Sequence, residues 1–318
     1  MMQDRNSKNV GYPSQFAIFL GLTGGGLIIS VILSAVIVLM MAGKIPASED
    51  ALLQPQYYNL VMVLQVVTTF FIFFIPTYFY SLICYRKPFI FLGYNFHFNY
   101  RQVFIIIAIL FLTFPLSGAL GELNKILPIP EHWATRFKAW ETSRAAQEAA
   151  LIQINSFSKY IISMVVIAFL PALFEETFFR AGLQNLFTRW FKGPWIAIIV
   201  TSIIFSLIHI SYYGFLVRFA LGFILGLVYY YSGSIWLNIL FHFLFNGLQV
   251  TALYAFSISK IPGKKDIETN FPMWMGALAL ILIIYLFMYF IKVSKAEKLK
   301  HTEEDNIETD DFTNWNTS

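Results

Sequence analysis

Charge is scarce in this 318-residue chain: only 13% of its residues are Asp, Glu, Lys or Arg, whereas 58% are hydrophobic. A soluble domain carries about 25% charged residues, so the composition excludes an ordinary water-soluble domain. Aromatic residues make up 18% of the chain, and such side chains suit a surface that meets acyl chains and headgroups. The sequence therefore predicts an integral membrane protein.

Cysteine is nearly absent as well. Cys84 is the one Cys in the sequence, which excludes a disulfide within the chain and leaves the redox compartment uncoded. The net charge of +4 comes from Lys and Arg at the ends of apolar runs. This placement anchors helices to headgroups, and no nucleic-acid partner is needed to explain it. The first apolar run is too long for a signal-peptide core and lacks a small-residue cleavage site, so we expect it to remain as a span.

Long apolar runs are abundant. A helix needs about 20 apolar residues to cross a bilayer, and backbone groups in hydrocarbon must be paired within the segment. The qualifying runs lie roughly at 16–42, 58–85, 102–121, 157–190, 195–213, 215–231, 234–257 and 272–292. They predict an all-α, polytopic membrane helical bundle of about eight transmembrane helices, formed by a single transmembrane domain over residues 1–300.

Two segments differ from the rest of the chain. In 122–156, Trp133, Phe137 and Trp140 recur at helical spacing among charged residues, which indicates an amphipathic surface helix or a solvated loop helix. The segment 301–318 is acidic and lacks a periodic apolar face, so we expect a disordered tail. A slight excess of Lys and Arg on the side of the termini favours cytoplasmic termini.

Ionisable side chains gather in one stretch of the apolar sequence. Each such residue in a span costs about 2.5–3.5 kcal/mol by insertion scales, so it predicts a partner or a task. With about 1.5 Å of rise per residue, the turns between the runs place these groups at similar depths in three helices. The sequence therefore predicts a shared polar site inside the bilayer, with these residues: Glu175, Glu176, Arg180, His209, His242 and Asn246.

Spacing suggests separate roles for these groups. Glu176 and Arg180 are four residues apart and can pair, which leaves Glu175 available about 100° around the helix. Glu175 and His209 would together bind and deprotonate a water. His242 and Asn246, also four residues apart, would stabilise an oxyanion. Packing hydrogen bonds between helices are the alternative for single polar residues, and Asn238 and Gln249 fit that alternative.

The same residues resemble the three motifs of the CPBP family, the CAAX protease and bacteriocin-processing membrane enzymes, also called Abi, which include the type II CAAX prenyl endopeptidases. Two glutamates followed three residues later by an arginine form the first motif. An aromatic residue with a histidine four on forms the second, and a histidine with a small or polar residue four on forms the third. The matching positions are, in order, Glu175, Glu176 and Arg180; Phe205 and His209; His242 and Asn246. The resemblance covers roughly 157–250 and marks 157–257 as the expected catalytic core.

The resemblance implies an intramembrane endopeptidase that hydrolyses a peptide bond of a membrane-associated protein or peptide, in a bacterial plasma membrane. Its implied catalytic residues are Glu175 and His209 for the water, with His242 and Asn246 for the oxyanion; the substrate, prenylated or not, stays open. No cofactor is favoured. A zinc ion on Glu175, His209 and His242 is the alternative, although no His-Glu-x-x-His helix is present.

Two other functions fit the same residues. Buried carboxylates could form the relay of a proton-coupled transporter, although no internal repeat is evident. A non-catalytic bacteriocin-immunity or scaffold protein could instead sequester a membrane peptide. The sequence favours the peptidase over both alternatives, because acid, imidazole and amide groups occur together in motif order.

Overall fold

The computed structural model describes residues 8–44, 52, 54–151, 154–258 and 271–314, and every regular element in them is helical. The α-helices are α1 (Tyr12–Ala42), α2 (Tyr58–Thr69), α3 (Ile75–Cys84), α4 (Pro88–Phe91), α5 (Tyr100–Ile126), α6 (Glu131–Leu151), α7 (Phe157–Ser163), α8 (Leu170–Glu176), α9 (Asn185–Trp190), α10 (Pro194–Leu207), α11 (Phe215–Ser232), α12 (Ile235–Ile258) and α13 (Met273–Asn314). A 3-10 turn, η2 (Pro55–Tyr57), and three π-helical segments, η3 (Phe70–Phe74), η4 (Met164–Phe169) and η5 (Thr177–Gln184), complete the set.

Among the described residues, seven helical stretches are long and apolar enough to cross a bilayer: Tyr12–Ala42, Tyr58–Cys84, Tyr100–Ile126, Phe157–Trp190, Phe215–Ser232, Ile235–Ile258 and Met273–His301. A shorter apolar helix, Pro194–Leu207, accompanies these seven. The prediction of an all-α polytopic bundle of about eight spans is confirmed. The chain is an integral, multi-pass membrane protein.

One boundary prediction was wrong. The run 195–213 was expected to be a single span, but α10 ends at Leu207. Its 14 residues rise about 21 Å, less than the roughly 30 Å of a hydrocarbon core. After Leu207 the chain forms a turn. Within it, the hydroxyl of Ser211 accepts a hydrogen bond from the backbone N–H of Gly214 at 3.0 Å. His209 therefore lies in a turn rather than in a helix.

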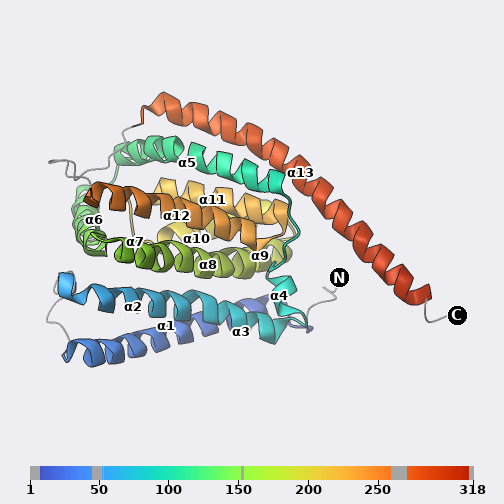
Figure 1. Cartoon of the computed structure of the whole chain (residues 1–318), viewed down its shortest axis with the longest axis horizontal. Helices are drawn as coiled ribbons and strands as arrows, with labels where there is room; N and C mark the ends of the chain where they lie inside the picture. Colours follow the sequence, from blue (N-terminus) through green and yellow to red (C-terminus); the bar gives the residue numbers. More distant parts are fainter. Residues whose placement is uncertain (1–7, 45–51, 53, 152–153, 259–270, 315–318) are drawn as a thin grey trace.

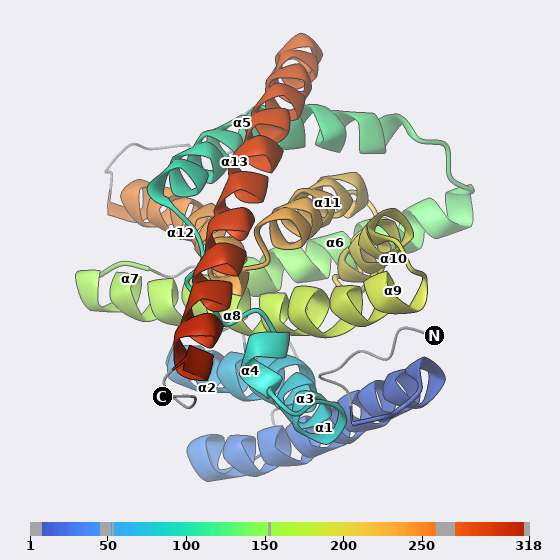
Figure 2. The ribbon, with the colours of Figure 1, turned by 90° about the vertical axis from the view of Figure 1, so that its right-hand side faces the viewer.

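The helices stack in layers (Figure 1). The fourth span, Phe157–Trp190, is a continuous stretch of α7, η4, α8, η5 and α9 that packs against α10 and α12. On one side α1 packs against α2 and α3, and this N-terminal hairpin contacts the fourth span. On the other side α5 packs against α11 and α13. The view from the end of the bundle shows this order, with α11 between the fourth span and the pair α5–α13 (Figure 2).

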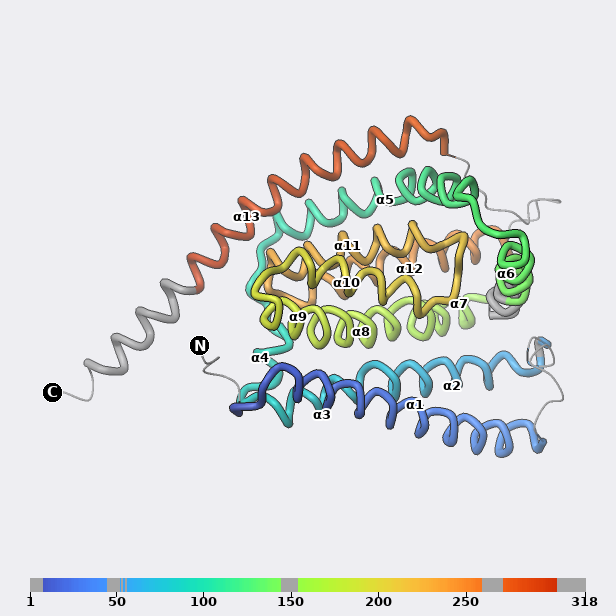
Figure 3. The backbone as a smooth tube through the Cα atoms, turned by 180° about the vertical axis from the view of Figure 1, so that it is seen from behind, coloured from blue at the N-terminus to red at the C-terminus, as the bar shows by residue number. Residues whose placement is uncertain are grey.

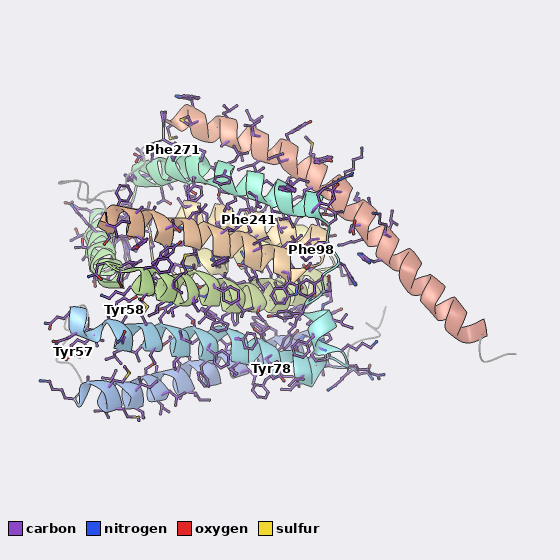
Figure 4. The ribbon with its side chains drawn as sticks, in the orientation of Figure 1. Tyr57, Tyr58, Tyr78, Phe98, Phe241 and Phe271 are labelled. Carbon is purple, nitrogen blue, oxygen red and sulfur yellow. The ribbon has the colours of Figure 1, made fainter. Side chains whose placement is uncertain are left out.

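Aromatic and aliphatic side chains fill the space between these helices (Figure 4). Phe241, in α12, is fully buried in a cluster that draws residues from α5, α11 and α13, among them Ile106, Leu225 and Phe290. The apolar contacts hold the layers together, while polar side chains on another face of α12 meet the fourth span.

Proline explains two of the π-helical segments. Segments η3 and η4 end two residues before Pro76 and Pro171, respectively. A proline cannot donate the i to i−4 hydrogen bond and its ring crowds the carbonyl one turn earlier. The preceding helix therefore widens, and the backbone N–H groups of Ile75 and Leu170 donate to Phe70 and Val165, five residues back. Each widened turn shifts the face that the following helix presents.

Helix α6 lies across the end of the bundle opposite the two chain ends (Figure 3). It begins at Glu131. Residues 122–126, which were predicted to belong to the surface segment, are instead the last residues of α5. Trp133 and Trp140 are exposed, whereas the Phe137 ring stacks on Tyr212 with centroids 4.9 Å apart. Aromatic contact thus fixes α6 over the turn that follows α10.

Helix α13 continues into the acidic segment for which composition predicts disorder, since helical backbone extends to Asn314. Extending an existing helix costs less than nucleating a new one. Glu297 also pairs with Lys300 at 3.8 Å and His301 at 3.5 Å, three and four residues on. The last residues of the predicted tail, 315–318, lie outside the described residues.

Candidate active site

Glu176 is the centre of a buried polar cluster between three spans. Its side chain is fully buried. One carboxylate oxygen accepts from Nδ1 of His242 at 2.8 Å. The other accepts from Nδ2 of Asn238 at 3.3 Å and forms an ion pair with Nε of Arg180, 3.2 Å away. A carboxylate in hydrocarbon requires such partners, because leaving one buried charge unpaired costs several kcal/mol. Glu176 therefore joins α8 to α12.

Arg180 and Gln184 fix the fourth span against α11. Nη2 of Arg180 donates to the backbone oxygen of Gly222 at 3.2 Å, and Nε2 of Gln184 donates to that of Gly226 at 2.9 Å. At Gly222 a Cβ atom would lie only 3.2 Å from atoms of Ser202 and Phe205. Two glycines four residues apart let the backbones of α10 and α11 approach, which exposes these carbonyls to the fourth span.

The Phe205 ring contacts three of the other motif residues. The ring of His209 lies edge-on to it at 4.9 Å between centroids, and that of His242 at 6.1 Å. The guanidinium of Arg180 sits over the same ring, 4.8 Å from its centroid. Phe205 thus brings groups from the fourth span, α10 and α12 around one aromatic side chain, and the cation–π contact supports the buried arginine.

Glu175 differs from its neighbour in exposure. Its side chain is half-buried, while that of Glu176 is inaccessible. It lies close enough to His242, Glu176, Arg180 and Arg218 to interact with each electrostatically. Of the two adjacent carboxylates, Glu175 is the one whose surface remains accessible to a small molecule.

His209 is held by its own backbone. Its Nδ1 lies 2.7 Å from the carbonyl oxygen of Phe205. Because a carbonyl oxygen only accepts, Nδ1 carries the proton in this contact, and Nε2 is the nitrogen that can take up a proton when the ring is neutral. The next residue, Ile210, has a φ of +47°, a rare value for a β-branched residue that stores strain beside the site.

Two neighbouring helices clasp the turn that carries His209. From α5, Nδ2 of Asn124 donates to the carbonyl oxygen of Tyr212 at 2.8 Å, and Oδ1 accepts from the backbone N–H of Leu216 at 3.0 Å. From α6, Glu141 accepts from the hydroxyl of Ser211 at 2.5 Å. The position of His209 therefore depends on α5 and α6 as well as on α10.

A tyrosine outside the spans reaches the same region. The Tyr94 hydroxyl lies 2.5 Å from Oγ1 of Thr177, the residue after Glu176, and its ring packs edge-on against Trp236 of α12. Burial raises the pKa of Tyr94 above the ordinary value for tyrosine. Tyr94 therefore stays a neutral hydroxyl at physiological pH and buttresses the helix turn next to the two carboxylates.

The side chains of the zinc alternative make other contacts in this structure. Within the described ranges, no three His, Cys, Asp or Glu side chains come together in a group that could hold a metal ion. Instead, His242 directs its Nδ1 to Glu176 and His209 its Nδ1 to a backbone carbonyl.

Most of the predicted site residues come together in the structure. Arg180 and His242 meet on Glu176, and Phe205 and His209 adjoin them. Asn246 is half-buried one turn beyond His242 on α12. The predicted pairing of Glu176 with Arg180 is present. That His242 binds the same carboxylate was not predicted.

The prediction that Asn238 forms hydrogen bonds between helices is confirmed, since its Nδ2 donates to Glu176 and to the carbonyl oxygen of Leu225. Two other residues near the site were not identified from the sequence. Arg218 lies within electrostatic range of Glu175, and a lone arginine in the apolar run 215–231 was a detectable signal. Asn124 gave no signal, because a polar residue near the end of a span is ordinary.

Comparison with known proteins places a family match on this part of the chain. Residues 157–248 match the family described as type II CAAX prenyl endopeptidase Rce1-like. The matched segment begins with α7 and ends within α12, so it contains Glu175, Glu176, His209, His242 and Asn246. Neither the curated proteins nor the solved structures compared with the chain include a match.

Proposed function

We propose that the chain is a CPBP-type intramembrane protease, because residues 157–248 match the Rce1-like family, and that it hydrolyses a peptide bond of a membrane-associated protein or peptide by direct attack of an activated water. The observation that carries this proposal is the different environment of two adjacent carboxylates. Glu176 is fully buried and bonded to neighbouring side chains, whereas Glu175 is partly accessible and close enough to His242 for an electrostatic interaction.

Glu175 and His209 act on the water in this mechanism. A carboxylate can accept the proton of a bound water, and His209, with Nδ1 donating to Phe205, offers Nε2 as a second acceptor. The water attacks the peptide carbonyl, and its proton passes to the leaving amine. The fixed Nδ1 contact of His209 supports this role, because it sets the ring tautomer before substrate binds.

His242 and Asn246 stabilise the oxyanion that forms. Nδ1 of His242 already donates to Glu176, so donation to an oxyanion would use the other ring nitrogen, Nε2. Asn246, one helical turn away, supplies an amide N–H as the second donor. Preorganised donors of this kind contribute about 3–4 kcal/mol each to lowering a barrier.

The substrate enters from the membrane phase or its interface. The matched family's name refers to CAAX prenyl endopeptidases, so a prenylated C-terminal peptide is the first substrate to test, with an unprenylated membrane peptide beside it. The start of α1 and the last turns of α13 lie at the same end of the bundle (Figure 1), and we propose that this end is cytoplasmic.

The test is cleavage by purified protein in liposomes that contain each peptide. We expect Glu175→Ala and His209→Ala to lower turnover by at least about 100-fold while the protein accumulates in the membrane. Glu122→Gln is the matched control, since Glu122 is an exposed carboxylate paired with Lys125 at 2.9 Å and should leave turnover unchanged. Retained turnover in Glu175→Ala would defeat the assignment. Membrane peptides that accumulate uncut in cells with Glu175→Ala identify the natural substrate.

A further inference from the structure

An apolar groove runs along the outer face of the bundle between α11 and α13. Its volume is about 380 Å³, and its walls include Phe219 and Tyr231 of α11 and Leu280 and Ile291 of α13. Every side chain that lines it is apolar or aromatic. The outer rim is open, since Leu280, Ile284 and Met288 are 46%, 53% and 59% exposed. A surface of this composition favours an apolar occupant such as an acyl chain.

The length of the groove indicates what kind of hydrocarbon it takes. From Leu280 to Ile291 the helix rises about 17 Å, and from Phe219 to Tyr231 about 18 Å. Half of a bilayer's hydrocarbon core is about 15 Å thick. The groove therefore matches the depth of one leaflet, and hence one extended acyl chain, rather than the whole thickness of the membrane.

One end of the groove is basic. The α13 residues that line it continue, at helical spacing after Ile291, to Lys295 and Lys298. Nζ of Lys298 donates to the backbone oxygen of Tyr230 at 3.2 Å, which fixes this cation beside the groove residue Tyr231. Lys295 is exposed one turn earlier. Two ammonium groups thus stand where the headgroup of a lipid in the groove would lie.

We propose that this groove is a specific site for an anionic phospholipid, with one acyl chain between α11 and α13 and the phosphate at Lys295 and Lys298. A phospholipid with no net charge would make the same apolar contacts, but its headgroup would be attracted less strongly by the two lysines. A lysine near a membrane surface favours an anionic lipid by about five-fold, so two lysines give a preference that is measurable.

The experiment is native mass spectrometry of the detergent-purified full chain, titrated with phosphatidylglycerol and with phosphatidylcholine of the same acyl chains. We expect the wild-type protein to retain one phosphatidylglycerol in preference to phosphatidylcholine. The double variant Lys295→Gln/Lys298→Gln should lose the headgroup preference and still bind both lipids. Ala220→Phe, which fills the groove, should lose both.

Two variants serve as matched controls. In Lys8→Gln the changed lysine also donates to a backbone oxygen, that of Leu82 at 2.7 Å, but belongs to the N-terminal hairpin. Val36→Phe places the same aromatic side chain at an exposed position of α1. Both should retain lipid as the wild type does. Equal retention of the two lipids by the wild type, or unchanged retention in Ala220→Phe, overturns the proposal. Displacement of the bound lipid by a prenylated peptide would also overturn it, by making the groove part of the substrate site.

Discussion

The fourth span carries two arginine-centred clusters nine residues apart, and they differ in chemistry. Arg180 faces the Glu176 carboxylate and the Phe205 ring. Arg189 donates to the backbone and side-chain oxygens of Asn185, at 3.2 and 3.1 Å, and lies over the ring of Phe91 at 4.6 Å. Both clusters are built on an arginine over an aromatic ring. Only the first contains carboxylates with imidazoles beside them.

The second cluster joins the N-terminal hairpin to the rest of the bundle. The Arg189 guanidinium also lies 5.0 Å from the ring centroid of Tyr85, whose hydroxyl donates to Gln15 at 2.5 Å. Tyr80 donates to the same amide oxygen at 3.0 Å. Hydroxyls and amides give directional bonds without exchanging protons near neutral pH. A buried arginine in a span is thus a general means of fixing helices, and it is the neighbouring acid and imidazole groups that make one cluster a candidate for catalysis.

Replacing Arg180 and Arg189 separately should give the largest difference in stability and cleavage between the two clusters. Arg180→Gln leaves the buried Glu176 carboxylate without its cation, which costs about 3–5 kcal/mol, and we expect cleavage to be lost. Arg189→Gln removes hydrogen bonds but strands no carboxylate, so its cost should be about 1.5–3 kcal/mol, with cleavage retained. Denaturant unfolding in micelles, together with the liposome assay, measures both. Equal losses of activity would mean that the two clusters serve one purpose.

Substitutions of the two adjacent carboxylates, Glu175 and Glu176, should affect stability and activity differently. Glu176→Gln weakens the bonds to Arg180 and His242, and we expect it to lower the free energy of unfolding by about 2–3 kcal/mol. Glu175→Gln should leave that free energy nearly unchanged and still abolish cleavage, because the half-buried Glu175 serves as base. Unfolding curves and turnover numbers from the same preparations make the comparison. A stable, active Glu175→Gln protein would contradict it.

Loss of the hydrogen bonds that hold the His209 turn is expected to have a smaller effect on stability and turnover. Asn124→Ala removes two hydrogen bonds to residues 212–216, which should cost about 1–3 kcal/mol and slow turnover about ten-fold through a looser His209. Asn99→Ala is the control, because Asn99 caps the other end of α5 and bonds Glu297 at 2.7 Å. It should destabilise the protein by about 1 kcal/mol with turnover intact. The assay at several temperatures below unfolding distinguishes the two variants.

The smallest effect on stability is expected for a substitution in the Arg189 cluster. Tyr85→Phe deletes the hydroxyl that bonds Gln15 and keeps the ring that stacks on Phe91 at 3.4 Å between centroids. We expect a loss of about 1 kcal/mol and unchanged cleavage. Hydrogen exchange in micelles should show the loss in α1 and α3 before the fourth span. Impaired cleavage in this variant would couple the hairpin to the reaction.

Much of this arrangement was predictable, because hydropathy and spacing are local properties. The eight apolar runs predicted the bundle, and the cost of a charge in hydrocarbon pointed to Glu175, Glu176 and Arg180. The end of α10 was mispredicted, since residues 208–213 are apolar enough to continue a span while Ser211 and Gly214 form a turn. The clasp by Asn124 was unpredictable, because its partners are backbone groups about 90 residues away in the chain.

The sequence by itself determined that the chain crosses a membrane as helices and that acid, imidazole and amide groups lie at comparable depths. Only the tertiary structure decided which carboxylate bonds His242. A straight helix fixes directions at 100° per residue, but η4 and η5 flank α8 and each widened turn rotates the helical residues after it. Glu175 and Glu176 follow η4, so the spacing of a straight helix does not give their directions, and the contacts of Glu176 with α12 emerge only in the folded bundle.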